Sequence, residues 1–372
     1  MQEKSKGSRV LIDGSRLMIE ALARAGADAF IGYPITPANL LYQYGSQRME
    51  LMLAAPDEIT TLQWMSGLAA TGKLPVTATS FPGFALMLES MNMAYMMELP
   101  MVIILVQRLG PATGTATCGA QGDLLLLKGM ISGGHPIPVL ATADFMDCWQ
   151  LSAKAAEIAV SLRTPVVLLT SKEEVMTHKS FNLDLLQEIN KVERKEFQLD
   201  CEYKSYKPTD FVPDFLPVTQ KRYQVRLNAS THDQTGILQH SNEESMANTR
   251  RLEEKVLHRM KAHYYYTFDE QKEASKLVIA YGITSSAAID AVEMLRGQGE
   301  KVSLLIPKTL IPCPDFYREL ILNYPRVVIA EENINHQFAS LLFGQNFPEN
   351  LAFCGSLGKM ISPGEIMEEV NK

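Results

Sequence analysis

The sequence predicts an α/β protein with a large, doubly wound parallel sheet and a second, smaller α/β domain. Helical and strand patterns alternate with short connections over residues 10–180, as a parallel sheet with helices on both faces requires. Its strands are continuous apolar runs such as 101–106, which is typical of strands buried on both faces. The alternation returns near the C-terminus. We expect a first domain over 1–180, a connecting arm over 181–273 and a second domain over 274–372.

The first helix and strand lead to a loop that contains two prolines. We expect Ser15 to cap a helix that ends at Gly26, followed by a strand over 29–33. Pro37 suits the first turn of the next helix, and Thr36 suits the cap position before it. Thr36 is therefore expected at the carboxyl end of a strand.

The next units repeat the pattern. Asp57 is expected to cap a helix that ends at Gly72, and a strand over 76–80 is followed by Pro82-Gly83. A methionine-rich helix over 84–99 favours core packing over a cofactor site. The strand over 101–106 then ends at Gln107 and Arg108.

The remaining predicted elements lie after residue 108. A loop of small residues over 109–121 precedes a helix, and the first domain closes with a strand over 138–141, a helix over 144–161 and a strand over 165–170. The arm is loosely patterned apart from a helix over 243–265. The second domain is predicted to have strands over 277–281, 302–306 and 327–330, alternating with helices after Thr284, Asp315 and Asn335.

Composition narrows the classes of function. The 372 residues carry a net charge of -7, which disfavours binding to nucleic acid or to an anionic membrane. No apolar stretch reaches the roughly 20 residues of a membrane span, and the N-terminus lacks a signal core, so a cytoplasmic location is expected. The five cysteines are far apart, which argues against a disulfide framework, a zinc site or an iron-sulfur site on this chain.

Ligands of open α/β sheets bind beyond the carboxyl ends of the strands, which directs attention to four loops. These loops carry Thr36, Glu58, residues 80–83 and residues 108–121. Each candidate also has a purely structural explanation. A carboxylate such as Glu58 is favoured in the first turn of a helix by the macrodipole, Thr36 can be a helix cap, and Arg108 can be a solvated charge. The amides and hydroxyls that follow Arg108 suit an anionic ligand equally well.

Several motifs, in order along nearly the whole chain, closely resemble the α subunit of 2-oxoacid:ferredoxin oxidoreductases. In the first domain they are Gly32-Tyr33-Pro34-Ile35-Thr36-Pro37, Glu58 spaced before Gly67 and Gly72, Thr77-Ala78-Thr79-Ser80-x-Pro82-Gly83-Phe84, Glu98-x-Pro100, and Val106-Gln107-Arg108-x-Gly110-Pro111-x-Thr113-Gly114. Further matches are Gln121-x-Asp123-Leu124, Gly133-Gly134-His135, Glu331-x-Asn333 and Gln337. The resemblance implies a thiamine-diphosphate-binding fold and a transketolase C-terminal-like second domain.

The resemblance also implies the site. Glu58, Arg108 and Thr36 are expected to be catalytic, with Glu58 hydrogen-bonded to N1′ of the coenzyme's aminopyrimidine. The wall around the coenzyme would add Tyr33, Pro34, Ser80, Pro82 and Gly83. The substrate would meet Thr36, Arg108, Thr113 and His135, although a lone loop histidine is usually just exposed. No metal ligand is expected on this chain.

The implied activity needs partners. The family oxidatively decarboxylates a 2-oxoacid to acyl-CoA and CO₂, and 2-oxoglutarate is favoured here over branched-chain 2-oxoacids or pyruvate. Thiamine diphosphate would be shared with a β subunit that carries Mg²⁺ and a [4Fe-4S] cluster, with γ and δ subunits possible and ferredoxin as acceptor. A non-catalytic structural or regulatory subunit is the alternative. A self-contained thiamine enzyme is disfavoured, because no Asn lies between Asn92 and Asn182 to complete a metal motif after Gly122-Asp123.

Two departures from the family pattern affect the expected pocket. Phe81 stands where the pattern usually has glycine, which puts a bulky ring near the site. Ala112 replaces the usual serine in the loop after Arg108. Neither change removes a catalytic group, but both bear on which 2-oxoacid fits.

Overall fold

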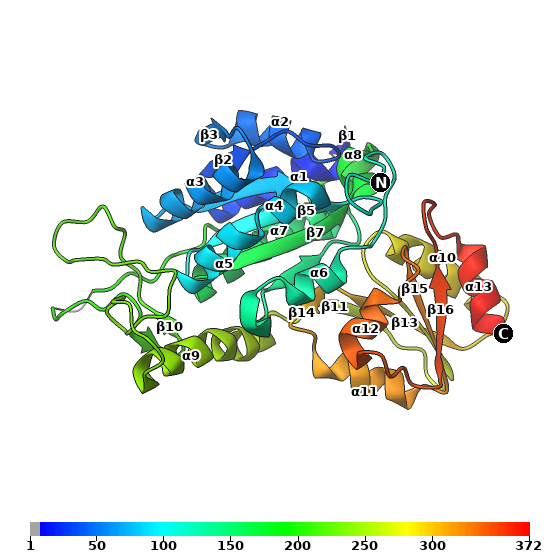
Figure 1. Cartoon of the computed structure of the whole chain (residues 1–372). Coiled ribbons are helices and arrows are strands. Elements are labelled where there is room, and N and C mark those ends of the chain that lie inside the picture. Colours follow the sequence, from blue (N-terminus) through cyan, green and yellow to red (C-terminus); the bar gives the residue numbers. More distant parts are fainter. Residues whose placement is uncertain (1–7, 199) are drawn as a thin grey trace, which may run out of the picture.

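Two sheets organise the chain in this computed structural model, which describes residues 8–198 and 200–372 (Figure 1). The larger sheet has seven strands in the order β14 (Thr309–Ile311), β6 (Val139–Ala141), β7 (Pro165–Ser171), β5 (Met101–Gln107), β4 (Pro75–Thr79), β2 (Ala29–Gly32) and β3 (Leu51–Ala54). All neighbours are parallel except β14 and β6. The predicted α/β class with a parallel main sheet is confirmed.

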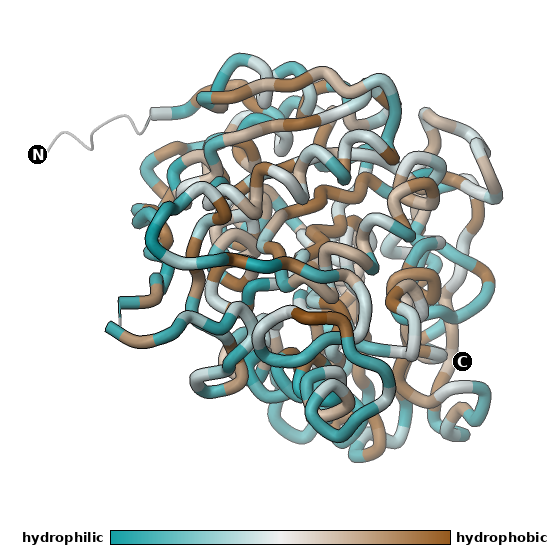
Figure 2. The backbone as a smooth tube through the Cα atoms, turned by 60° about the vertical axis from the view of Figure 1, so that its left-hand side comes forward, coloured by the Kyte–Doolittle hydropathy of each residue, from teal (hydrophilic) through white to brown (hydrophobic). Residues whose placement is uncertain are grey.

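Helices accompany the larger sheet along its length. They are α1 (Gly14–Ala25), α2 (Asn39–Arg48), α3 (Glu58–Ala70), α4 (Phe81–Leu86), α5 (Leu88–Met96), α6 (Leu124–Gly129), α7 (Phe145–Leu162) and α8 (Lys172–Met176), with 3-10 turns at Ser132–Gly134 and Leu183–Leu185. A two-stranded ribbon, β1 (Arg9–Ile12) with β8 (Lys179–Asn182), closes the first domain. The apolar strands run through the interior of the molecule in Figure 2.

Several predicted helix starts can be compared with the structure. Asp57 caps α3 as expected, because its carboxylate accepts a hydrogen bond from a first-turn amide, and Asp144 caps α7 in the same way. The prediction for Ser15 is wrong, since Asp13 caps α1 and the Ser15 hydroxyl donates to a backbone carbonyl instead. The prediction for Thr36 is wrong as well, because α2 begins two residues after Pro37 and no side chain caps it.

The predicted methionine-rich helix over 84–99 is two helices, α4 and α5, which meet at Met87. Met87 and Met91 are fully buried, so this part of the chain does supply core packing. Two short strands of the first domain, β1 and β3, escaped prediction because each has four residues and only partial burial.

The second domain is a five-stranded sheet in the order β11 (Tyr266–Asp269), β13 (Val302–Pro307), β12 (Lys276–Ala280), β15 (Arg326–Glu331) and β16 (Leu351–Gly355). Its helices are α10 (Thr284–Gly297), α11 (Asp315–Asn323), α12 (Gln337–Phe343) and α13 (Pro363–Asn371). β11 lies inside the expected arm, and β14 leaves this domain to join the larger sheet. The two domains are therefore interlocked.

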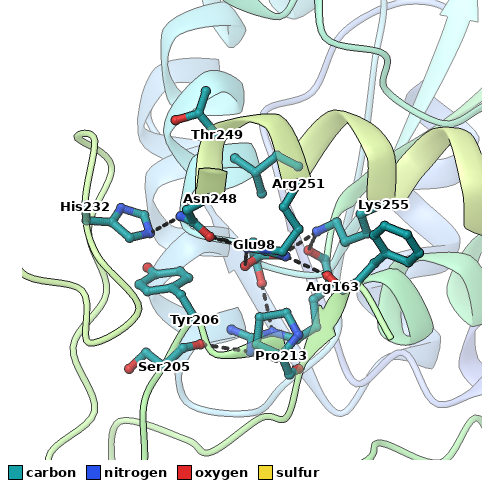
Figure 3. A network of polar contacts seen from close by, with 12 residues as sticks. Glu98, Arg163, Ser205, Tyr206, Pro213, His232, Asn248, Thr249, Arg251 and Lys255 are labelled. Atoms are coloured by element: carbon teal, nitrogen blue, oxygen red, sulfur yellow. Dashed lines mark hydrogen bonds and ion pairs between the residues drawn. The ribbon is translucent and has the colours of Figure 1, made fainter. Parts of the chain in front are cut away.

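The arm is held against the first domain by α9 (Glu243–Arg259), which continues as a 3-10 turn at Met260–His263. The arm's other regular structure in the described residues is the end of β8, the 3-10 turn at Leu183–Leu185, the pair β9 (Pro208–Thr209) and β10 (Val212–Pro213), and β11. Figure 3 shows α9 presenting Arg251 and Lys255 to the buried carboxylate of Glu98, at 2.7 and 2.6 Å. Within the described residues, no helix has the length and apolar character to cross a lipid bilayer.

Candidate functional site

The order of strands places four predicted loops at one edge of the larger sheet. β3 and β4 lie on opposite sides of β2, so the chain changes direction at β2, and such switch points form ligand crevices in open α/β sheets. Thr36 follows β2, Glu58 follows β3, Ser80 follows β4 and Arg108 follows β5. Since the strands are parallel, all four residues come to the carboxyl edge.

Thr36 and Arg108 meet directly at this edge. The Arg108 guanidinium donates a hydrogen bond through Nη1 to the Thr36 carbonyl at 2.5 Å. The Ser80 hydroxyl donates to the same carbonyl at 3.4 Å. Arg108 is only 7% exposed and its Nε has no partner among the described residues, so part of a buried cation is left for another acceptor. Burial lowers the pKa of Arg108 while Asp123 opposes that change.

Glu58 is a buried carboxylate without a partner. It occupies the first position of α3 and is 6% exposed, and in the part of the chain that the structure describes it makes no hydrogen bond or ion pair with another side chain. A Cβ on Gly83 would collide with Glu58 Oε1 and Thr79 Oγ1, so the glycine leaves the room that the carboxylate occupies. Because the Glu58 oxygens are not among the fully buried atoms, this carboxylate stays open to a ligand from outside the chain.

Asp123 and Gln107 belong to the site but were not predicted as site residues. The Asp123 carboxyl is buried, and burial raises its pKa to about 6, against the opposing effects of Gln107 and Arg108. Asp123 Oδ2 and Gln107 Nε2 lack hydrogen-bond partners in the described residues. Their signal in the sequence was only the position of Gln107 at a strand end and of Asp123 in the Gln121-x-Asp123 motif.

The remaining predicted residues of this edge differ in exposure. Tyr33 is 41% exposed and Pro34 is also exposed, whereas Ser80 and Gly83 are buried and Pro82 is half-buried. Thr113 lies at the exposed tip of the loop after Arg108. Phe81 is half-buried in the first position of α4.

His135 does not join the other predicted residues. It precedes β6, so it lies at the amino edge of the sheet, opposite the edge of Arg108. Its ring packs edge-on against Tyr95, with centroids 6.0 Å apart, and it lines a hollow of about 580 Å³ between α5 and the arm. The sequence could not distinguish the two edges, because both are lined by loops.

The larger hollows of this chain also lie elsewhere. One of about 810 Å³ is lined by α1, α2 and Trp149, away from Glu58 and Arg108. Within residues 8–198 and 200–372, no three His, Cys, Asp or Glu side chains are grouped so that they could hold a metal ion. The carboxyl edge presents a carboxylate, a guanidinium and hydroxyls.

This set of groups suits two ligand chemistries. A buried carboxyl can share a proton with a ring nitrogen, and a partly unpartnered guanidinium can pair with a carboxylate. The carboxylate of Glu58 and the unpartnered buried atoms of Arg108 and Asp123 could therefore serve a heteroaromatic cofactor and an anionic substrate.

The chain is similar to a known protein family and to several of its members. The family described as pyruvate flavodoxin/ferredoxin oxidoreductase, thiamine diP-binding, matches residues 20–251. The 2-oxoglutarate synthase subunit KorA of Methanothermobacter marburgensis is 30% identical over 88% of this chain and 88% of its own length. KorA of Methanocaldococcus jannaschii is 28% identical over 87% and 88%. The chain spans only half of 2-oxoglutarate oxidoreductase subunit KorA of Mycobacterium tuberculosis, which is 29% identical.

Solved structures support the fold. A 2-oxoglutarate:ferredoxin oxidoreductase from Magnetococcus marinus, with 2-oxoglutarate, coenzyme A and succinyl-CoA bound, superposes with a TM-score of 0.92. The match covers 100% of this chain and 66% of that chain at 24% identity. A split-gene transketolase aligns with a TM-score of 0.52 at 15% identity. The chain thus belongs to the pyruvate flavodoxin/ferredoxin oxidoreductase family of thiamine diphosphate-binding proteins, among the α subunits of 2-oxoacid:ferredoxin oxidoreductases.

Proposed function

We propose that this chain is the α subunit of a 2-oxoglutarate:ferredoxin oxidoreductase, and that its carboxyl edge is one wall of an active site shared with a β subunit. The reaction would convert the 2-oxoacid to acyl-CoA and CO₂, and the electrons would pass to ferredoxin through the partner. The observation that carries the proposal is the carboxyl of Glu58, 6% exposed and without a side-chain partner in the described residues, at the same edge of the sheet as the hydrogen-bonded pair Arg108 and Thr36.

The choice of substrate rests on the named relatives. Four KorA proteins called 2-oxoglutarate synthase subunits match 87–88% of this chain. A ketoisovalerate oxidoreductase subunit VorB, at 29% identity over 83% of the chain, supports branched-chain 2-oxoacids as the next candidates. Phe81 would narrow the pocket and is the residue to vary when the two substrate classes are compared.

Thiamine diphosphate, when bound, supplies the carbon nucleophile and stabilises the negative charge that decarboxylation leaves. Glu58 would hold a proton against N1′ of its aminopyrimidine. A carboxyl group shielded from water does this well, because its pKa can approach that of the ring nitrogen.

Arg108 would bind the carboxylate of the 2-oxoacid, and the Thr36 hydroxyl would donate a second hydrogen bond to the substrate. At about 4 Å and an effective dielectric near 20, two opposite unit charges gain about 4 kcal/mol, which is enough to orient a small anion. The hydrogen bond between Arg108 and the Thr36 carbonyl sets the direction of the guanidinium before substrate arrives.

The partner would supply the other half of the site. Because no grouping of metal-binding side chains occurs in the described residues, we assign Mg²⁺ and the diphosphate to the β subunit, together with the [4Fe-4S] cluster. The exposed Tyr33 and Ile59, at 41% and 43%, lie next to the predicted cofactor wall and are suited to be covered by that subunit.

Co-expression with the β subunit tests the proposal. The complex, supplied with thiamine diphosphate, Mg²⁺ and coenzyme A, should reduce viologen dye when 2-oxoglutarate is added. Arg108→Ala should raise the KM for 2-oxoglutarate by about 10²-fold or more. Arg24→Ala, which removes an exposed arginine paired with Glu20 on another face, is the matched control. Unchanged kinetics in Arg108→Ala would assign the site elsewhere, and inactivity of every complex would favour a structural subunit.

A further inference from the structure

The crevice of the second domain is filled by a side chain of the first domain. In the second sheet, β13 and β15 lie on opposite sides of β12, so the chain reverses direction at β12. The carboxyl ends of β12 and β15 therefore border a switch-point crevice, where open α/β domains usually bind a ligand. In this chain the side chain of Gln121 occupies that place.

The contacts of Gln121 resemble those of a bound ligand. Its Nε2 donates to the Tyr281 carbonyl at 2.7 Å, and its Oε1 accepts from the Thr284 hydroxyl and the Glu332 amide, both at 2.7 Å. The Gln121 amide donates to the Glu332 carbonyl at 2.9 Å, and Asn333 Nδ2 donates to the Gln121 carbonyl at 3.0 Å. Gln121 is 1% exposed, so these hydrogen bonds are shielded from water.

The crevice is shaped for this side chain. Gly282 has a φ of +60°, and a Cβ there would lie 2.8 Å from Gln121 Nε2, so a larger residue would displace the amide. On the other side, Gln337 donates to the Gly122 carbonyl at 2.9 Å and accepts from the Leu125 amide at 3.1 Å. The second domain thus holds both Gln121 and the residues that follow it.

The held segment is the end of the loop that begins at Arg108. The tip of this loop is exposed, and its own closure is the antiparallel bridge between Leu109 and Thr115. Its far end, Asp123, is buried beside Arg108 and Gln107. Fixing Gln121 therefore fixes the carboxyl group of Asp123 two residues further on, and with it the electrostatic surroundings of Arg108.

We propose that Gln121 is a positioning residue, and that the second domain binds it as an internal ligand in order to set the loop over 109–122 and the guanidinium of Arg108 for the 2-oxoacid. The kinetic part of this inference rests on the proposed function. The second domain then contributes to substrate binding through its hydrogen bonds to Gln121.

Gln121→Met in the αβ complex tests the proposal, because methionine has a similar length but cannot make the three amide hydrogen bonds. We expect the KM for 2-oxoglutarate to rise roughly tenfold or more, with kcat changed less than about threefold, since the group that positions the substrate is displaced. Gly282→Ala should act in the same direction with Gln121 retained. Asn350→Ala is the control, because the Asn350 side chain donates to the carbonyls of Ile321 and Tyr324 inside the second domain.

Hydrogen exchange provides a readout that needs no turnover. In the substrate-free complex, the amides of residues 109–120 should exchange faster in Gln121→Met and Gly282→Ala than in the wild type, and not in Asn350→Ala. Unchanged exchange in both variants, or an equal rise in KM in Asn350→Ala, would overturn the proposal. If no complex oxidises any 2-oxoacid, the proposed function fails while the exchange result still decides the role of Gln121.

Discussion

The buried carboxylates at the two edges of the larger sheet differ in whether they have charged partners. At the amino edge, Glu98 is fully buried, with Arg251 bound bidentately at 3.0 and 2.7 Å and Lys255 at 2.6 Å (Figure 3). At the carboxyl edge, Glu58 is almost as buried and has no such partner in the described part of the chain. Complete pairing is what a structural anchor needs, whereas an unpaired carboxyl group indicates a position kept for a ligand.

The pKa of Glu98 shows how strong the pairing is. Burial alone would raise the pKa of this carboxyl group, but Arg251 and Lys255 outweigh that effect and hold the pKa well below its usual range. Burial also lowers the pKa of Lys255 to about 8, against the attraction of Glu98. The arm is therefore attached to the first domain by a charge cluster that stays ionised at neutral pH.

The largest expected effect is the loss of activity in Glu58→Gln, which would distinguish the function of Glu58 from that of Glu98. Glu58→Gln should lower kcat for 2-oxoacid oxidation by about 10²- to 10⁴-fold, because the side chain can no longer exchange a proton with the cofactor. The fold should be unaffected, since no hydrogen bond or ion pair in the described residues is lost. Viologen reduction and thermal melting of the αβ complex measure the two outcomes. A full loss of thermal stability with the loss of activity would make Glu58 a structural residue like Glu98.

Glu98→Ala should show the converse. It leaves Arg251, Lys255 and Arg163 buried without their carboxylate, which costs about 3–5 kcal/mol of folding free energy. Chemical denaturation measures this cost, and activity per folded molecule should stay near the wild-type value. Arg259→Ala serves as the control. Arg259 lies on α9, as Arg251 and Lys255 do, and its exposed ion pair with Asp210 should contribute less than about 1 kcal/mol.

A third change tests how tightly the carboxyl edge is shaped. Gly83→Ala places a methyl group against Glu58 Oε1 and Thr79 Oγ1, so the carboxylate must move. Activity should fall by about 10²-fold with the fold preserved, because a displacement of about 1 Å is enough to misalign a catalytic group. Gly129→Ala, where nothing lies within 4 Å of the added atom, should leave the rate unchanged. Equal rates in both variants would show that the position of Glu58 is not constrained by Gly83.

The smallest expected effect is a pH-dependent change in stability when Glu332, at the contact between the two domains, is replaced. Burial raises the pKa of Glu332 to about 7, and the nearby Glu173 adds to the rise. Because the folded pKa is the higher one, the contribution of Glu332 to stability is fully present below about pH 4.5 and is lost as the pH rises through about 7. Glu332→Gln should therefore stabilise the chain at pH 8, by about 2 kcal/mol, and change little at pH 5. Denaturation at both pH values tests this, with the exposed Glu349→Gln as control.

The sequence was a good guide wherever the signal is local. Asp57 was predicted as a cap because an acidic side chain before an apolar periodic segment satisfies first-turn amides without help from distant residues. The central strands were predicted because burial on both faces makes them uniformly apolar. The same rule failed for Thr36. Its carbonyl accepts hydrogen bonds from Arg108 and Ser80, which are both distant in sequence, and α2 starts only at Asn39.

Some residues of the candidate site could also be predicted from the sequence. Strand ends and loops identified Thr36, Glu58, Ser80 and Arg108, because parallel strands bring their carboxyl ends together. The role of Gln121 arises only from contacts with residues 160 or more positions away, which leave no periodic pattern in the sequence. His135 lies in a loop of the same kind but on the opposite edge, a distinction that depends on chain direction rather than on residue type.

The strand β14 has a consequence for how this polypeptide is made. It pairs with β6 and covers the edge of the larger sheet, yet it lies more than 160 residues after β6 in the chain. A ribosome would release almost the entire first domain before that edge is protected, and a bare strand edge is prone to pair with other chains. Gene fragments that stop before Thr309 should accordingly aggregate, even though they contain every residue of the proposed catalytic wall.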